Sequence, residues 1–178
     1  FGVIGCGNIG SRVAELFSIF GGPVLVNDPH PATEPEWFTN NNVERVDLET
    51  LLSRCDYISL NASLDDTSLH MINSKTIKSL KKGAYICNNA RGALVEEDAI
   101  SAAIKSGQLS GYAADAMEVE PVKADHPFLK NDRILVTPHT SAYTYECLHG
   151  MGEKCVSDVK AIVAGKRPGR ELTHNLDD

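Results

Sequence analysis

The sequence opens with Phe1-Gly2-Val3-Ile4-Gly5-Cys6-Gly7-Asn8-Ile9-Gly10, a short apolar run followed by a turn with three glycines. A helical pattern follows over 11–20, and a second apolar run, 24–26, ends on Asn27-Asp28. Strand, glycine turn, helix, strand and acid, in this order, form the fingerprint of a dinucleotide-binding βαβ unit. The flanking elements make the pattern far more specific than three spaced glycines alone.

Each part of this fingerprint has a chemical role. The glycines allow a tight turn and a close approach of the backbone to a pyrophosphate. The helix that follows points unpaired N–H groups and the positive end of its dipole at the phosphates. A carboxylate at Asp28 can accept both ribose hydroxyls and would repel a 2′-phosphate, which favours NAD over NADP. The alternative is a glycine turn that packs a helix on a sheet in another α/β protein.

Composition limits the class of protein. The 178 residues can bury one good core, so a single domain, 1–178, is expected. A net charge of −7 without a basic cluster argues against nucleic acid or an anionic membrane as a partner, and no apolar stretch is long enough to span a bilayer. The five cysteines lack CxxC spacing and predict reduced thiols in a cytoplasmic protein. No histidine has a partner at metal-ligand spacing, so no metal is expected.

Apolar runs alternate with helical patterns along the chain, which predicts a doubly wound parallel sheet with helices on both faces. Asp47 and Ser74 are expected to cap two of the helices, and Gly107 to end a third. The proline-rich loop after Asn27 is expected to hold no regular element, and the polar C-terminal residues to be mobile. Besides the opening βαβ unit, strands are expected near 57–60, 84–87, 111–114 and 134–137, and helices at 48–54, 75–80, 96–105 and 143–164.

Polar residues follow the predicted strands, at the sheet edge where α/β proteins bind ligands. Arg91 could clamp the carboxylate and carbonyl of a small acid through bidentate bonds. His139 could give a proton to a carbonyl that receives hydride, and Glu120 lies in a loop that could bring a carboxylate to the imidazole. Asp115 could hold the nicotinamide. The alternatives are structural: a surface ion pair for Arg91, packing for a lone histidine, and a turn cap for Asp115.

Taken together, these residues resemble the NAD-binding domain of the D-isomer-specific 2-hydroxyacid dehydrogenases over essentially the whole chain. The resemblance implies an NAD-dependent oxidoreductase in which Arg91 binds and polarises a 2-oxo acid, His139 is the acid and base, and Glu120 tunes it. The motifs that carry the resemblance are Gly5 to Gly10, Asn27-Asp28-Pro29, Asn88 to Val95, Asp115 with Glu120-Pro121, and Thr137-Pro138-His139-Thr140. The cofactor lining implied by the resemblance is Gly5, Gly7, Asn8, Ile9, Gly10, Asp28, Ala62, Ser63, Ser68, Asn89, Ala90, Arg91, Asp115 and His139.

The resemblance also points to one branch of the family, and the sequence differs from the family pattern at one position. The segments 69–73 and 137–144 are similar to the D-lactate and D-2-hydroxyisocaproate branch, while glycerate and phosphoglycerate types stay open. Most members carry proline where this chain has Ser63, which leaves the adenine contact open. Members of the family usually dimerise through their nucleotide-binding domains. They also have a second domain, built mostly from sequence ahead of the glycine turn, that closes over the substrate and is absent here.

Other interpretations remain. Because Phe1 lies next to a predicted core strand, we expect the chain to be a domain of a longer protein. An NAD(H)-sensing regulator, similar to the transcriptional corepressors of this family, would use the same fold to present a partner surface. An isolated dinucleotide-binding module without catalysis would follow if the chain is natural as it stands.

Overall fold

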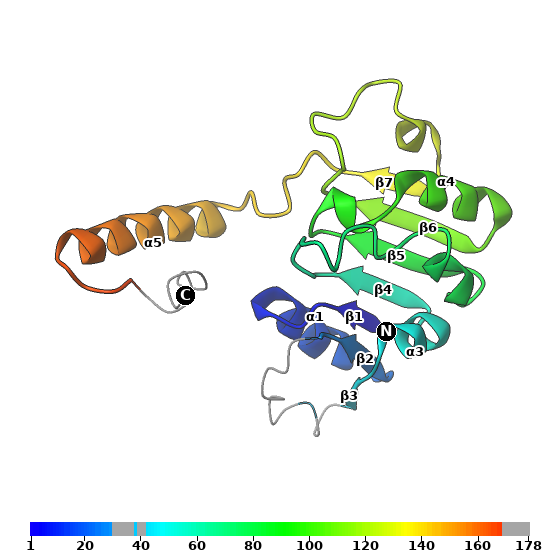
Figure 1. Ribbon diagram of the computed structural model, residues 1–178, viewed down its shortest axis with the longest axis horizontal. Helices are drawn as coiled ribbons and strands as arrows, with labels where there is room; N and C mark the ends of the chain where they lie inside the picture. Colours follow the sequence, from blue (N-terminus) through cyan, green and yellow to red (C-terminus); the bar gives the residue numbers. More distant parts are fainter. Residues whose placement is uncertain (30–37, 39–41, 169–178) are drawn as a thin grey trace. The chain divides into compact units, whose positions relative to one another are not determined.

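The computed structural model describes residues 1–29, 38 and 42–168. They belong to two compact units, Phe1–His139 and Thr140–Asp178. Figure 1 shows the first unit as a sheet flanked by helices. Most of the proline-rich loop and the C-terminal end lie outside the described residues, so the expectations of an irregular loop and a mobile end stay predictions.

The first unit is built on a seven-stranded sheet in the order β3-β2-β1-β4-β5-β6-β7, and every neighbouring pair is parallel. Strand order reverses between β1 and β4, so the crevice at their carboxyl ends is the topological switch point. The predicted doubly wound α/β fold is confirmed. The strands are β1 (Gly2–Ile4), β2 (Val24–Asn27), β3 (Val43–Arg45), β4 (Tyr57–Leu60), β5 (Ala84–Asn88), β6 (Leu109–Ala114) and β7 (Ile134–Val136).

Helices pack on both faces of the sheet. A small core that includes Ala14 and Val26 lies beneath α1 (Asn8–Ser18). The larger core lies on the other face, beneath α3 (Leu48–Arg54), the 3₁₀ helix η1 (Thr76–Ser79) and α4 (Glu97–Ser106). Its isoleucines and leucines are almost fully buried, and each such side chain contributes about 1.5–3 kcal/mol relative to exposure. Two further 3₁₀ helices, η2 (Gly92–Leu94) and η3 (Pro127–Lys130), lie in the connections that follow β5 and β6.

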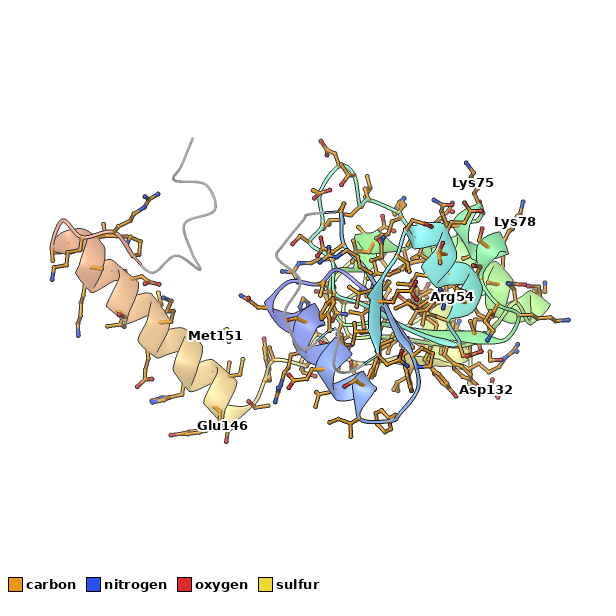
Figure 2. The ribbon with its side chains drawn as sticks, turned by 90° about the horizontal axis from the view of Figure 1, so that it is seen from below. Arg54, Lys75, Lys78, Asp132, Glu146 and Met151 are labelled. Carbon is orange, nitrogen blue, oxygen red and sulfur yellow. The ribbon has the colours of Figure 1, made fainter. Side chains whose placement is uncertain are left out.

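Helix ends follow local side-chain chemistry, with one correction. Asp47 caps α3 as predicted, because its carboxylate accepts the Thr50 N–H at 2.8 Å. The predicted cap at Ser74 is wrong. Asn73 lies one residue earlier, and its Oδ1 accepts two N–H groups, from Lys75 at 2.9 Å and from Thr76 at 3.1 Å. This turn shortens the helical segment to η1. Lys75, just before η1, and Lys78 within it reach outward in Figure 2.

The second unit contains α5 (Tyr145–Val163), which begins where the Thr144 hydroxyl accepts the Cys147 N–H at 3.1 Å. Its apolar residues recur at helical spacing and stay largely exposed; Leu148 is 49 % and Met151 is 50 % exposed. Exposed apolar stripes are typical of interaction surfaces. Within the described parts of the chain, no helix is both long enough and apolar enough to cross a membrane.

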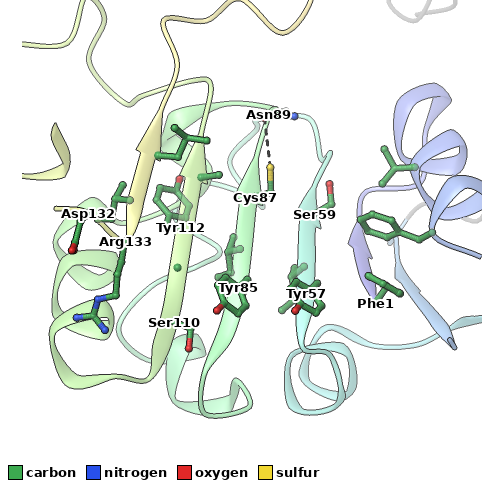
Figure 3. Close-up of a pocket in the computed structure, with 18 residues that line it drawn as sticks. Phe1, Tyr57, Ser59, Tyr85, Cys87, Asn89, Ser110, Tyr112, Asp132 and Arg133 are labelled. Atoms are coloured by element: carbon green, nitrogen blue, oxygen red, sulfur yellow. Dashed lines mark hydrogen bonds between the residues drawn. The ribbon is translucent and has the colours of Figure 1, made fainter. Parts of the chain in front are cut away.

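An open groove runs along the sheet beside α1 (Figure 3). Phe17 of α1 and the strands β4 to β7 line it, and the rings of Tyr57 and Tyr85 stack in it with centroids 5.2 Å apart. Its lining is mostly aromatic and aliphatic. The residues with acid–base chemistry instead follow the carboxyl ends of the strands.

Candidate active site

The glycine turn between β1 and α1 is shaped by packing at two positions and is open at a third. Gly5 has φ +84°, and a Cβ there would lie 2.5 Å from the Ala62 nitrogen. A Cβ on Gly10 would lie 1.8 Å from the Gly5 carbonyl oxygen. A Cβ on Gly7, the N-cap of α1, would meet no protein atom within 4 Å. The turn therefore leaves the helix N-terminus accessible, as the pyrophosphate of NAD requires.

Alanine substitutions should separate these two roles. Gly7 has φ −73°, which alanine adopts freely, so Gly7→Ala should change the free energy of unfolding by less than about 0.5 kcal/mol. The added methyl group blocks the backbone approach and should weaken NADH binding by about tenfold. Gly10→Ala should lower the free energy of unfolding by about 1–3 kcal/mol through overpacking. Urea denaturation and NADH fluorescence titration measure the two effects. Equal losses of stability in both variants would contradict this assignment.

Asp28 follows β2 and reaches the glycine turn. Its Oδ2 accepts the Cys6 N–H at 2.6 Å, and its carbonyl oxygen accepts a bond from Arg45 at 3.1 Å. Both contacts fix the acid beside the turn, where the ribose of a dinucleotide lies in this fold. Asn8 and Ile9, the first residues of α1, are exposed.

The loop after β4 is stabilised from within. The Ser68 hydroxyl donates to the Ser63 carbonyl at 2.7 Å and accepts the Asp65 N–H at 2.9 Å. Ser68 is buried, whereas Ser63 is exposed and Ala62 is half-buried. Ser68 would therefore act on a cofactor through the loop that it shapes, and the predicted contacts of Ala62 and Ser63 stay predictions.

The loop that carries Arg91 is organised by Asn88, the last residue of β5. Asn88 is fully buried; its amide nitrogen donates to the Arg91 carbonyl at 2.9 Å, and its amide oxygen accepts the Ala90 N–H at 3.1 Å. The side chains of Asn89 and Arg91 are thereby presented at the end of the sheet. Asn88 was expected only as a member of the 88–95 motif, with no role of its own. An asparagine directly after an apolar strand is the signal that could have found it, since such amides fold turns.

His139 and Glu120 are paired at the carboxyl end of β7. His139 Nδ1 lies 2.9 Å from Glu120 Oε2, and Glu120 Oε1 accepts the Met117 N–H at 2.9 Å. The bond to His139, and then the bond to Met117, hold the pKa of Glu120 below its ordinary value; burial and the charge of Asp115 oppose them by less. Since Nδ1 faces the carboxylate, Nε2 is the ring nitrogen that can serve a substrate. His139 also has φ +54°, a conformation that is rare outside glycine and enriched at functional sites.

A histidine–glutamate pair is not diagnostic in this chain. Three more exist among the described residues: His70 with Glu118, His126 with Glu97, and His149 with Glu153. What sets His139 apart is its position just after the carboxyl end of β7, at the same end of the parallel sheet as Arg91. Within the described residues, no group of three or more His, Cys, Asp or Glu side chains could hold a metal ion.

Asp115 joins the ends of three strands. It is 3 % exposed, its Oδ1 accepts the Thr137 hydroxyl at 2.6 Å, and its N–H donates to the Asn88 carbonyl at 3.0 Å. These bonds tie β6 to β5 and to the segment that leads into His139. Asp115 therefore has a structural function in addition to the nicotinamide contact predicted for it.

The chain is similar to known proteins over most of its length. Residues 1–141 match the family model described as D-isomer specific 2-hydroxyacid dehydrogenase, NAD binding domain. A glyoxylate reductase of Thermofilum pendens is 34 % identical over 170 residues, which cover 94 % of this chain and 49 % of the relative. The chain therefore spans about half the length of the curated relatives that it matches.

Solved structures of similar proteins lead to the same family. An NAD-complexed D-isomer specific 2-hydroxyacid dehydrogenase from Lactobacillus delbrueckii ssp. bulgaricus superposes with a TM-score of 0.84 at 33 % identity, covering 94 % of this chain and 54 % of that chain. A D-lactate dehydrogenase from Aquifex aeolicus, complexed with NAD and lactic acid, superposes with a TM-score of 0.82 at 35 % identity, covering 92 % of this chain and 53 % of that chain.

Proposed function

Since this chain belongs to the D-isomer specific 2-hydroxyacid dehydrogenase family, with residues 1–141 as the NAD-binding domain, we propose that it serves hydride transfer between NAD(H) and a small 2-oxo or D-2-hydroxy acid. NAD is the cofactor of this domain family, and structural neighbours contain it. One observation carries the proposal: the His139–Glu120 pair lies at the same end of the sheet as Arg91 and the open glycine turn.

The proposed roles follow from the atoms that each side chain presents. Bound NADH supplies a hydride to C2 of the oxo acid. His139 donates the Nε2 proton to the oxygen at C2 while Glu120 holds Nδ1–H and stabilises the imidazolium. Arg91 binds the substrate carboxylate and stabilises negative charge on the same oxygen. In the reverse direction, Nε2 takes up the hydroxyl proton.

The substrate side chain is proposed only as a class. The segments around His70 and after His139 support the D-lactate and D-2-hydroxyisocaproate branch. The relatives, however, include a glyoxylate reductase, a hydroxypyruvate reductase and a D-3-phosphoglycerate dehydrogenase. We propose that residues 1–178 carry the dinucleotide-binding domain, whose sheet lies in the first compact unit, and that a separate substrate domain shapes the pocket for this side chain.

The direct test is NADH oxidation by the longest natural form of the protein, with pyruvate, 2-oxoisocaproate, glyoxylate, hydroxypyruvate and phosphohydroxypyruvate as separate substrates. Turnover with one acid would support the dehydrogenase and identify its branch. NADH binding without turnover of any of the acids would contradict the proposal and favour the NAD(H)-sensing alternative.

Asp28 is proposed to select NAD over NADP. Asp28→Asn keeps an oxygen that can accept the Cys6 N–H, but it removes the charge that would repel a 2′-phosphate. The ratio of the Kd for NADPH to the Kd for NADH should therefore fall by about tenfold, which is about 1.4 kcal/mol. Fluorescence titration with both cofactors measures this ratio. Glu44→Gln, which neutralises an acid on neighbouring β3, is the control, and an equal fall in that variant would speak against Asp28.

A cytoplasmic homodimer is also proposed. All five cysteines are free thiols, which supports a reducing compartment. The exposed apolar stripe of α5 supports an interface between protein chains. Sedimentation of the protein would give its mass in solution, and a monomer across the micromolar range would contradict the dimer.

A further inference from the structure

Glu97, the first residue of α4, joins two separate points of the loop that follows β6. Its Oε1 accepts the Glu118 N–H at 3.1 Å, and its Oε2 lies 3.1 Å from His126 Nε2. The side chains of His126 and Glu97 are 23 % and 20 % exposed, whereas those of His139 and Glu120 are 49 % and 37 % exposed. The pair is the most shielded of the four histidine–glutamate pairs described.

The tautomer of His126 follows from its two bonds. Its Nδ1 accepts the Phe128 N–H at 3.3 Å, so the ring proton lies on Nε2 and is donated to Glu97. The imidazole stands edge-on to the ring of Phe128, with centroids 5.1 Å apart. Phe128 is 1 % exposed and belongs to the larger core. His126 is therefore fixed to the core at one nitrogen and to Glu97 at the other.

The main chain around Glu118, to which Glu97 is hydrogen-bonded, is also in contact with the proposed catalytic groups. Met117, one residue before Glu118, donates its N–H to Glu120. A Cβ on Gly92 would lie 2.0 Å from the Met117 carbonyl carbon, so the residue next to Arg91 packs directly on this segment. A displacement of the 117–118 main chain would loosen the bond to Glu120 and the support beneath the Arg91 loop.

We infer that Glu97 and His126 are positioning residues, which hold the 117–120 segment so that Glu120 keeps His139 oriented for proton transfer. The catalytic meaning of this inference rests on the proposed function. Neither side chain is required to touch substrate or cofactor; they act through the main chain of Glu118.

Two substitutions at His126 separate its two bonds. Asparagine places an amide oxygen where Nδ1 lies, so His126→Asn keeps the acceptor for Phe128 and loses the donor to Glu97. Glutamine places an amide nitrogen where Nε2 lies, so His126→Gln keeps the donor to Glu97. We expect His126→Asn to lower kcat about 10- to 100-fold with the Kd for NADH within about twofold, and His126→Gln to recover most of the loss.

Glu97 can be compared with Asp98, the next residue in the same first turn of α4. The single oxygen of Glu97→Gln cannot serve both Glu118 and His126, so this variant should behave like His126→Asn. Asp98→Asn neutralises an exposed acid in the same first turn of α4 and should behave like the unmodified protein. Circular dichroism checks that each variant folds. If Glu97→Gln does not fold, the comparison of His126→Asn with His126→Gln tests the positioning role.

A second measurement needs no turnover. The pKa of Glu120, measured by carbon-13 NMR of its carboxyl group and assigned with Glu120→Gln, should rise toward the ordinary glutamate value in His126→Asn and stay low in His126→Gln and Asp98→Asn. An unchanged pKa of Glu120 in folded His126→Asn would overturn the inference. A raised pKa would support the positioning role even if the unmodified protein reduced no oxo acid, so the two proposals can fail separately.

Discussion

Replacement of His139 by alanine should lower kcat by about 10²- to 10⁴-fold, the usual contribution of a positioned general acid. The substitution removes the Nε2 proton donor and leaves Glu120 without its imidazole partner. It removes no part of the glycine turn, so the Kd for NADH should change by less than about twofold. Stopped-flow or steady-state NADH oxidation gives kcat, and fluorescence titration gives the Kd.

The positive φ of His139 requires a second variant. Alanine adopts φ +54° at a cost, whereas asparagine tolerates this region, so His139→Asn should lose the proton donor with less strain. His149→Asn is the control for the loss of a histidine–glutamate pair outside the 117–120 segment, because His149 pairs with Glu153 within α5. Two results would show that His139 supports the structure rather than donating a proton. One is a comparable loss of turnover in the control variant, and the other is a loss of NADH affinity in the His139 variants that equals their loss of turnover.

Replacement of Arg91 by alanine should lower kcat/KM for the oxo acid by about 10²- to 10³-fold, because the substrate loses a charged bidentate partner in both the ground state and the transition state. KM should rise and kcat should fall together. The guanidinium is exposed, and its Nη1 donates to the Ala90 carbonyl at 2.7 Å, so the substitution should not disturb the core. Inhibition by an unreactive 2-oxo acid analogue measures the binding part of the loss.

Arg91→Lys tests the geometry rather than the charge. Lysine keeps a cation but cannot offer two parallel N–H bonds, so its kcat/KM should fall between those of the unmodified protein and the alanine variant. Full activity of the lysine variant would contradict bidentate binding. A loss of NADH affinity equal to the loss of kcat/KM would place Arg91 with the cofactor instead of the substrate.

The parts of the fold that depend on local patterns were predictable. The glycine turn, the strands β1, β2, β4 and β5 and the cap at Asp47 each follow from neighbouring residues. β3 was missed because it has three residues, two of them charged, which gives no apolar signal. The cap assigned to Ser74 failed because two adjacent residues could both cap, and only the backbone decides between them.

The site was predictable only where its groups follow strands. Arg91, Asp115 and His139 were chosen by that rule, and Glu120 was chosen as a carboxylate within reach of His139. Glu97 and His126 gave no such signal, since their bond joins a helix to a loop 29 residues away in sequence. The bond between Asp115 and Thr137 could not be predicted either, because it joins residues that are far apart in the sequence. Which residues touch the cofactor and the substrate stays a prediction until the variants above are measured.

The contact of Gly92 with the Met117 main chain bears on how the site fluctuates. Backbone lies against backbone there, with no side chain between them that could change rotamer and absorb a displacement. The loop before α4 and the loop after β6 should therefore move together. Thermal excursions of Arg91 and Glu120 will be correlated, so the spacing of the two groups should vary less than the position of either one.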